Sequence, residues 1–157
     1  MASITIRKAL PADGPVIAKF NALMAQETEH RTLEHLLLRS GVETVLGDET
    51  KGTYYLAEID GEVAGQLMIT YEWSDWRNGT FWWIQSVYVR EEYRSKGVFK
   101  ALYRFVEDAA KKKKDVCGLR LYVEKNNNRA MKAYEKMGMK KSGYEIYESD
   151  FVLKDHS

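Results

Sequence analysis

The chain contains a single cysteine, Cys117, among its 157 residues. One thiol excludes a disulfide bond within the chain and fits a reducing compartment. No apolar run approaches the length of a membrane-spanning helix, and residues 1–10 lack the apolar core of a signal peptide. We therefore expect a cytoplasmic protein with no segment in a membrane.

The chain also has almost no excess of charge of one sign, because its formal net charge is only +1. This balance provides no overall field that would attract nucleic acid or a membrane surface, so neither is expected as a partner. The basic run at residues 111–114 is short and is interpreted as the solvated end of a helix. His30 and His35 do not have metal-ligand spacing, and we predict no bound metal.

Two nucleotide-binding motifs are missing as well. The chain has neither the Gly-x-x-x-x-Gly-Lys-Ser/Thr loop nor the Gly-x-Gly-x-x-Gly fingerprint. Their absence argues against an ATPase and against a dinucleotide-dependent dehydrogenase. No repeat, low-complexity segment or linker divides the chain. Its length and its apolar fraction of 45% therefore predict one globular domain over residues 1–157.

The first part of the sequence alternates between strand and helix patterns. Residues 3–7 read as a short strand, and Asp13 is a candidate cap for the helix that follows. A polar stretch at residues 26–31 interrupts the apolar face of this helix. Thr32 is then a candidate cap for a second helix, and the capping-box spacing that begins at Ser40 predicts a further short one.

The middle of the sequence is rich in strand patterns. Residues 54–59 and 62–71 read as two strands, and the Asp-Gly pair between them predicts a tight hairpin. Residues 72–80 are interpreted as a polar turn region. Residues 81–89 then form a third, unusually aromatic strand.

The last part of the sequence predicts helix, strand, helix and two short strands. Apolar residues recur at helical spacing over residues 99–110, and residues 119–123 read as a strand. A helix is expected over residues 129–137, followed by short strands around 142–145 and 149–153. Because a helix joins the aromatic strand to the next strand, those two strands should be parallel in a mixed sheet. The fold class predicted is α/β.

The segment after the aromatic strand is a candidate phosphate site. A charged loop opens directly into an amphipathic helix, so backbone N–H groups and the positive end of the helix dipole face one spot. Basic side chains in the loop add charge-assisted contacts. From this short pattern alone, an ordinary loop with solvated basic residues is the better explanation. The residues of the candidate site are Arg94, Ser95, Lys96, Gly97, Val98, Phe99 and Lys100.

A second segment changes this balance. Residues 127–139 read Asn-Asn-Arg-Ala-Met-Lys-Ala-Tyr-Glu-Lys-Met-Gly-Met, which resembles the Asn-x-x-Ala-x-x-x-Tyr-x-x-x-Gly-Phe motif of the GNAT superfamily of acetyl-CoA-dependent N-acetyltransferases. The Arg-x-x-Gly spacing at residues 94–97 resembles the pyrophosphate loop of the same family. Both motifs occur in the family's order. The resemblance implies a GNAT-like α/β (α+β) fold, with helices on both faces of a mixed sheet that splays between two parallel strands.

The resemblance also implies a mechanism with acetyl-CoA as cosubstrate. The backbones of Val87, Tyr88 and Val89 would line the pantetheine arm, and one of them would polarise the thioester carbonyl. Tyr134 would act as the general acid for the departing thiolate, and Asn127 would contact the pantetheine arm. The resemblance also implies a bulge in the first of the two parallel strands, although from the residues alone no glycine or proline proves a bulge near Tyr88. Likewise, Tyr134 could simply pack in the core and Asn127 could simply cap a helix.

One residue departs from the family pattern. Phe99 stands where the family has a small residue that lets phosphate and helix approach closely. We expect its ring to point into the core beside Leu102 and Val106. The departure affects the tightness of the loop more than its existence.

The acceptor side of the reaction is less clear from the sequence. Glu27 and Glu29 lie where the family builds its acceptor site, and they are candidates for binding a cationic amine; two solvated carboxylates are an equally good interpretation. Trp83 and Gln85 are further candidates from the aromatic strand, although glutamine cannot act as a base. Packing explains most of the four tryptophans at least as well.

Two functions therefore stay open. The first is an N-acetyltransferase that moves acetyl from acetyl-CoA to a primary amine, small molecule or peptide, by direct attack. The second is a non-catalytic GNAT module that senses acyl-CoA or binds a protein. The sequence does not identify the acceptor, and it leaves open whether the protein forms a homodimer.

Overall fold

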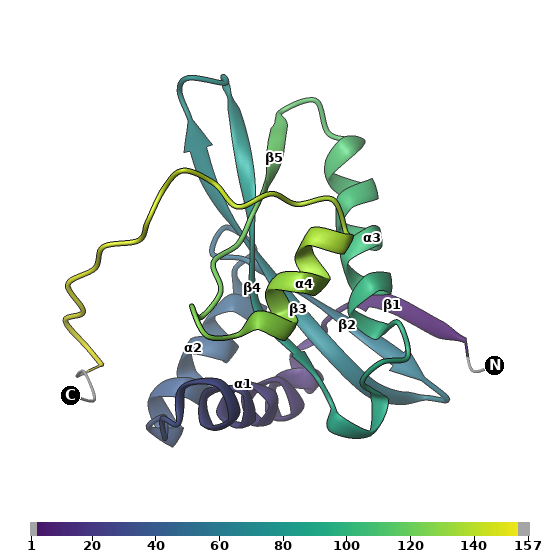
Figure 1. Ribbon diagram of the computed structural model, residues 1–157. Helices are drawn as coiled ribbons and strands as arrows, with labels where there is room; N and C mark the ends of the chain where they lie inside the picture. The colour runs from purple at the N-terminus through teal and green to yellow at the C-terminus, as the bar shows by residue number, and fades with distance from the viewer. Residues whose placement is uncertain (1–2, 154–157) are drawn as a thin grey trace. The chain divides into compact units, whose positions relative to one another are not determined.

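The computed structural model describes residues 3–153 (Figure 1). It divides into two compact units, Met1–Tyr122 and Val123–Ser157, and each is considered by itself. The first unit contains a five-stranded sheet in the order β1-β2-β3-β4-β5, antiparallel except for the predicted parallel pair β4–β5. The strands are β1 (Ile4–Lys8), β2 (Thr53–Ile59), β3 (Glu62–Ser74), β4 (Gly79–Val89) and β5 (Val116–Arg120).

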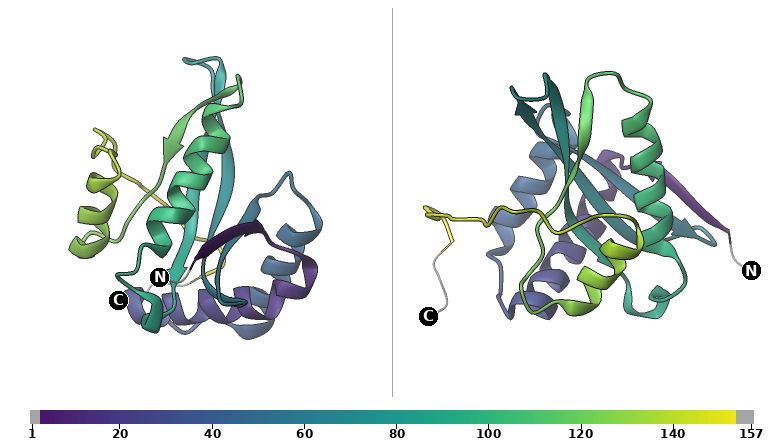
Figure 2. Two further views of the ribbon diagram at one scale, coloured as in Figure 1. Left: turned by 90° about the vertical axis from the view of Figure 1, so that its right-hand side faces the viewer. Right: turned by 45° about the horizontal axis from the view of Figure 1, so that its top comes forward.

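Helices cover both faces of this sheet (Figure 2). On β2, Leu56 packs in a cluster with residues of α1 and α2, whereas the neighbouring Tyr55 ring lies 5.4 Å from the ring of Phe105 on α3. Alternation along the strand therefore directs one face to α1 and α2 and the other to α3. The helices of this unit are η1 (Pro11–Asp13), α1 (Gly14–Glu29), α2 (His35–Gly47), η2 (Glu91–Tyr93) and α3 (Val98–Lys111).

The hairpin between β2 and β3 forms as predicted. Asp60 has a φ of 51° and Gly61 a φ of 79°, the left-handed pair that a tight two-residue turn requires. The polar turn predicted for residues 72–80 is much shorter, because β3 continues to Ser74 and β4 begins at Gly79. The long β3–β4 hairpin extends beyond the rest of the sheet (Figure 1).

The start and end of α1 differ from the prediction. The Asp13 side chain does not cap α1; it pairs with Arg7 at 2.8 Å and accepts a hydrogen bond from the Leu10 N–H at 2.7 Å. The polar stretch does not interrupt the helix, which ends at Glu29 with His30 in the left-handed region. A helix surface tolerates several polar residues where it faces water, so loss of apolar periodicity does not mark its end.

The predicted caps of α2 are also wrong. Glu34, not Thr32, begins the helix, and its carboxylate accepts hydrogen bonds from the N–H groups of Leu36 and Leu37. The helix then runs through Ser40 without a break, so no separate short helix forms. A capping box needs a non-helical residue at its first position, and the earlier carboxylate cap removes that condition.

The last predicted strands do not form in the described residues. β5 begins at Val116 and ends at Arg120, earlier than predicted. Residues 142–145 and 149–153 belong to no helix or strand, and Tyr147 and Phe151 are 91% and 96% exposed. Because a strand requires a neighbour for its backbone groups, a local apolar pattern does not suffice to form one. In the second unit the helix α4 (Asn128–Lys136) forms one residue earlier than predicted.

Gly65 permits a close approach of β3, β4 and α3. A Cβ atom at this position would lie 2.9 Å from the Tyr88 carbonyl oxygen and 3.0 Å from Cγ1 of Val98, the first residue of α3. Gly65→Ala should therefore lower the free energy of unfolding by about 1–3 kcal/mol, measured by urea denaturation. Gly41→Ala is the control, because nothing lies within 4 Å of its added Cβ. That helix position should instead gain about 0.5–1 kcal/mol, and equal effects at the two glycines would contradict the packing described.

Candidate functional site

A bulge interrupts β4 near its carboxyl end. Gln85 and Tyr88 pair with residues only two apart on β3, so Ser86 and Val87 share one partner position. Ser86 has a φ of 53°, a conformation that non-glycine residues rarely adopt. The bulge that the family resemblance implied is present, one to two residues before Tyr88.

The bulge changes the face to which the following side chains point. Gln85 lies opposite Met68, which packs against the cluster under α1 and α2. In a regular strand Tyr88, three residues later, would point to the other face. Because of the extra residue it points to the same face, where its ring lies 5.1 Å from the ring of Phe20 on α1.

The sheet splays immediately beside this bulge. The parallel pairing with β5 covers only Thr80–Trp83 of β4, and β5 ends at Arg120. Residues 84–89 of β4, which include Val87 and Val89, have no partner strand on that side among residues 3–153. Figure 1 shows β5 beside only the upper part of β4. A sheet splayed between its parallel strands is thus confirmed.

The predicted phosphate loop leads from β4 into α3. Ser95 and Gly97 both have positive φ, 65° and 83°, and α3 begins at Val98 with no acidic residue in its first turn. Its first N–H groups have no acceptor within the helix and project from its positive end. Lys96 lies in the same loop, with its ammonium 5.9 Å from the Tyr93 ring. The geometry of the loop fits a bound anion.

Phe99 is placed differently from the expectation. The buried side of α3 consists of Val98, Leu102, Tyr103, Val106 and Ala110. Phe99 is only half-buried, and its ring lies 6.1 Å from the ring of Tyr103. The side chain therefore lies at the border of the core rather than inside it. Its position on the helix, one residue after Val98, is the cause.

Arg94 and Tyr88 meet at the carboxylate of Glu27. Arg94 Nη2 lies 2.7 Å from Glu27 Oε1 and its Nε donates to the Val89 carbonyl at 2.9 Å. The Tyr88 hydroxyl donates to Glu27 Oε2 at 2.6 Å. Burial opposes the charge of Glu27, but hydrogen bonds from Tyr88 and Arg94 outweigh it and lower the pKa of the carboxyl. Burial and the neighbouring Glu27 raise the pKa of Tyr88 to about 12.

Replacement of Glu27 by glutamine should lower the pKa of Tyr88, because the charge that disfavours the tyrosinate is gone. Burial, the larger cause, remains, so the pKa should stay above the ordinary value of about 10. Alkaline difference titration against Tyr88→Phe measures it. Glu43→Gln, on the exposed face of α2, is the control. A Tyr88 titration unchanged by Glu27→Gln would contradict the contact.

The same cluster links folding stability to pH. Tyr88 has a raised pKa in the folded state, so its contribution is complete below about pH 10 and is lost as the pH rises toward 12. Glu27 has a lowered pKa, so its contribution is present above the ordinary carboxyl pKa and is lost as the pH falls through its folded value. Glu27→Gln should weaken both dependences.

Two of the remaining acceptor candidates, Trp83 and Gln85, precede the bulge on β4 and lie on its α1–α2 face. Gln85 Nε2 donates to Thr70 Oγ1 at 2.5 Å, and Trp83 Nε1 donates to Glu72 at 3.2 Å. Glu72 also pairs with Arg120 at 2.8 Å. Glu72 and Arg120 were not predicted, and only pairing across three strands brings them together.

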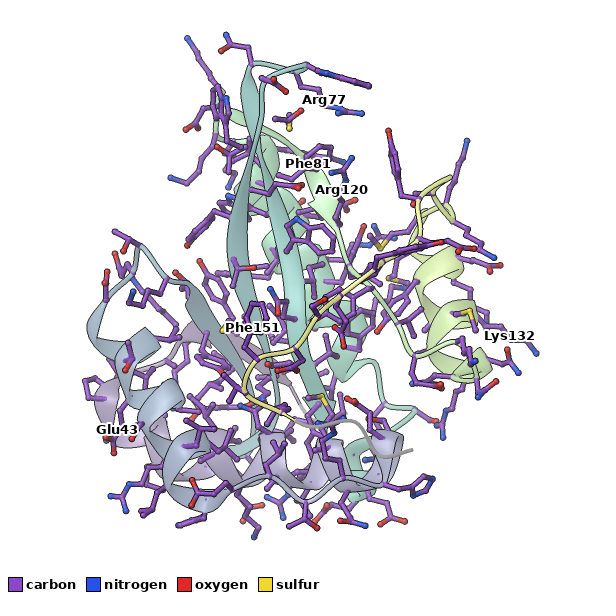
Figure 3. The ribbon with its side chains drawn as sticks, turned by 90° about the vertical axis from the view of Figure 1, so that its left-hand side faces the viewer. Glu43, Arg77, Phe81, Arg120, Lys132 and Phe151 are labelled. Atoms are coloured by element: carbon purple, nitrogen blue, oxygen red, sulfur yellow. The ribbon has the colours of Figure 1, made fainter. Side chains whose placement is uncertain are left out.

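Two guanidinium groups flank a phenylalanine ring near the same place. Arg120 lies 3.7 Å and Arg77 4.9 Å from the centroid of the Phe81 ring. Figure 3 shows these three side chains gathered near the end of the β3–β4 hairpin. The contacts hold the Arg120 head group over the sheet, where it meets Glu72. Glu29, by contrast, is exposed at the last position of α1.

The second unit contains the other two predicted site residues. The Asn127 side chain accepts a hydrogen bond from the Ala130 N–H at 3.2 Å, so the predicted cap of α4 is confirmed. Gly138, with a φ of 100°, follows the helix. Burial raises the pKa of the Tyr134 phenol, which therefore stays protonated at neutral pH.

Within residues 3–153, no helix is both long and apolar enough to cross a membrane. In the same part of the chain, no three histidine, cysteine or carboxylate side chains gather as metal ligands would.

Comparisons with known proteins agree with this geometry. A family model described as the acetyltransferase (GNAT) family matches residues 20–139. A solved structure of a possible acetyltransferase from Clostridium difficile 630 is 45% identical, with a TM-score of 0.88, and the match covers 96% of this chain and 99% of that one. No curated protein matches the chain.

More distant solved structures share the fold. A predicted acetyltransferase from Clostridium acetobutylicum, solved with acetyl-CoA, is 16% identical with a TM-score of 0.76 over 98% of this chain and 100% of that one. A ribosomal-protein-alanine N-acetyltransferase from Brucella melitensis biovar Abortus 2308 is 21% identical, with a TM-score of 0.77 over 95% and 99%. With the bulged β4, the splayed sheet and the family model over most of its length, the chain belongs to the GNAT family of acetyltransferases.

Proposed function

We propose that the protein is an N-acetyltransferase that transfers acetyl from acetyl-CoA to a primary amine. The observation that carries the proposal is the bulge of β4, which lies beside the splayed sheet and a few residues before the anion-binding loop. The family model runs across the boundary between the two units, so we propose one domain over residues 1–157.

Acetyl-CoA would bind along the open side of β4. The loop at residues 94–100 supplies N–H groups and positive charge for the pyrophosphate. The backbones of Val87, Tyr88 and Val89 provide hydrogen-bonding groups for the pantetheine arm, and Asn127 adds a further contact. Val87 N–H is the donor to the thioester carbonyl, where it stabilises the charge that develops on oxygen.

The reaction is a direct displacement. The amine nitrogen attacks the carbonyl carbon, the carbon–sulfur bond breaks, and the CoA thiolate takes a proton from Tyr134. The proton that the new amide nitrogen loses passes through solvent and restores the Tyr134 phenol. A phenol with a raised pKa is protonated at neutral pH and can serve as this acid. Metal takes no part in these steps.

The acceptor would approach from the α1–α2 face. Gln85 and Trp83 lie there on β4, and Glu27 lies at the same face beside Tyr88. Glu29, exposed at the end of α1, is a proposed contact for a cationic acceptor. A small-molecule or peptide amine fits these side chains; the Brucella melitensis structure is that of a ribosomal-protein-alanine N-acetyltransferase.

Calorimetric titration with acetyl-CoA, followed by a panel of amines with a free-thiol readout, tests the proposal. Binding with thiol release for at least one amine is the expected result. Binding without release from any amine would instead favour an acyl-CoA sensor, and no binding would remove the assigned role of the loop. The solution mass of the protein, measured with and without acetyl-CoA, decides whether it is a homodimer.

A further inference from the structure

A buried ring of polar side chains lies directly behind the bulge of β4. Gln66 is fully buried, and Asn21 and Tyr54 are only 5% and 4% exposed. These side chains come from β3, α1 and β2, and all three point to the α1–α2 face. Gln66 and Tyr54 both hydrogen-bond to Ser86, the residue with the strained backbone, and Asn21 lies between them.

Gln66 is the donor in both of the hydrogen bonds that it makes in this ring. Gln66 Nε2 donates to the Ser86 carbonyl at 3.0 Å and to Asn21 Oδ1 at 3.0 Å. Asn21 Nδ2 then donates to the Tyr54 hydroxyl at 3.1 Å. Burial raises the pKa of Tyr54, while hydrogen bonds with Asn21 and with the Ser86 side chain oppose the shift, so the ring closes on Ser86. Because a carbonyl only accepts, the nitrogen of Gln66 must face it, which fixes both amide orientations.

This ring of hydrogen bonds determines the direction of the backbone N–H of Val87. The carbonyl of Ser86 and the N–H of Val87 belong to one planar trans peptide, so they point in opposite directions. The structure has no cis peptide bond among residues 3–153. Since the Gln66 side chain holds the carbonyl, the Val87 N–H points away from Gln66, at a place where β4 has lost its partner strand on one side.

We propose that Gln66 is a positioning residue for carbonyl activation: it orients the Ser86–Val87 peptide so that the Val87 N–H meets the thioester oxygen. The inference rests on the proposed function. Asn21 and Tyr54 hold Gln66 in turn, and their effects decrease with distance from the bulge.

Stability alone does not explain a glutamine at this position. Gln66 Oε1 is buried without a hydrogen-bond partner, and such an acceptor is a net cost to folding. A leucine would remove this unpartnered oxygen, but it would also leave Asn21 Oδ1 without the donor that Gln66 supplies. What a leucine cannot do is donate to the Ser86 carbonyl.

Gln66→Leu tests the proposal. We expect kcat to fall by about 10- to 100-fold, as when a reacting group is displaced by about 1 Å, with unchanged affinity for acetyl-CoA. With acetyl-CoA labelled with carbon-13 at the thioester carbonyl, the infrared stretch of the bound carbonyl should lie at lower frequency in the wild type than in Gln66→Leu. A merely structural glutamine would not move that frequency.

Thr53→Val is the matched control. The Thr53 hydroxyl lies 3.0 Å from the Tyr71 hydroxyl, is also buried, and belongs to the α3 face, away from the bulge. Thr53→Val should lower the free energy of unfolding and leave both kcat and the carbonyl frequency at their wild-type values. Along the hydrogen bonds from Gln66 through Asn21 to Tyr54, the loss of kcat should decrease. Gln66→Leu should have the largest effect, Asn21→Leu a smaller one and Tyr54→Phe the smallest. Equal kcat and equal carbonyl frequency in Gln66→Leu and the wild type would overturn the inference.

A readout without cosubstrate separates this inference from the proposed function. If the wild type does not bind acetyl-CoA, the proposed function fails. The nitrogen-15 amide resonance of Val87 in the free protein then still reports whether Gln66 orients the Ser86–Val87 peptide. A resonance that moves in Gln66→Leu and not in Thr53→Val supports the orientation by Gln66. A resonance that stays in place in both variants overturns it.

Discussion

Tyr134→Phe should lower kcat by about 10²–10⁴-fold while the affinity for acetyl-CoA is preserved, because only the proton donor to the leaving thiolate is lost. The wild-type phenol has a raised pKa, so it stays protonated and active to a higher pH than an ordinary tyrosine. In alkaline solution, kcat should fall only above the ordinary pKa of about 10. Steady-state thiol release and calorimetry measure the two quantities separately.

Tyr147→Phe is the control for this variant. Tyr147 lies in the same unit, is 91% exposed, and loses the same single oxygen. It should have wild-type kcat. If Tyr134→Phe also kept the wild-type kcat at every pH, Tyr134 would have no part in the mechanism.

Arg94→Glu should weaken acetyl-CoA binding by about 10- to 100-fold or more, the value of a charge-assisted hydrogen bond to phosphate plus the added repulsion. Arg94 is tethered to Glu27 and to the Val89 carbonyl, so its guanidinium is already held at the loop. Arg94→Gln removes the charge without repulsion and should weaken binding less. Calorimetry at two salt concentrations should show a smaller salt dependence in both variants.

Arg39→Glu provides the same charge reversal at a distant place. Arg39 is exposed on α2 and pairs only with Glu43 among the contacts described for it. Its variant should bind acetyl-CoA like the wild type. Equal affinity in Arg94→Glu and the wild type would mean that the loop does not bind the pyrophosphate.

Local patterns were sufficient for much of the fold. The Asp-Gly pair predicted the β2–β3 hairpin because its φ values are set within two residues. The amphipathic pattern predicted α3, and the helix between two strands predicted their parallel pairing. The predicted caps of α2 were wrong, since Thr32, Glu34 and Ser40 are all possible caps and the sequence does not say which of them begins the helix.

The bulge could not be predicted from β4 itself. Ser86 has no glycine or proline beside it, and the group that holds its carbonyl, Gln66, lies 20 residues earlier in the chain. Asn21, which orients Gln66, is 45 residues further away. The strained backbone of Ser86 is stabilised by partners that only tertiary packing supplies. The residue pattern within one strand contains no information about those partners.

Glu27 shows the same limit within the candidate site. The sequence placed it in a polar stretch and suggested a carboxylate open to an amine. The structure gives it two partners, Arg94 and Tyr88, which follow it by 67 and 61 residues. The prediction identified a relevant residue, but its partners depend on the bulge that turns Tyr88 toward α1.

The short reach of β5 has a consequence for the lifetime of the protein in a cell. Within the described residues, Ile84–Val89 of β4 have no strand beside them on the side where β5 ends. Such an edge opens and exchanges its amide hydrogens more readily than a paired one. A cosubstrate lying along it would restore the missing neighbour and, at a concentration about a hundredfold above its Kd, add about 2.7 kcal/mol of stability. Proteolysis through this edge should then be faster without the cosubstrate than with it.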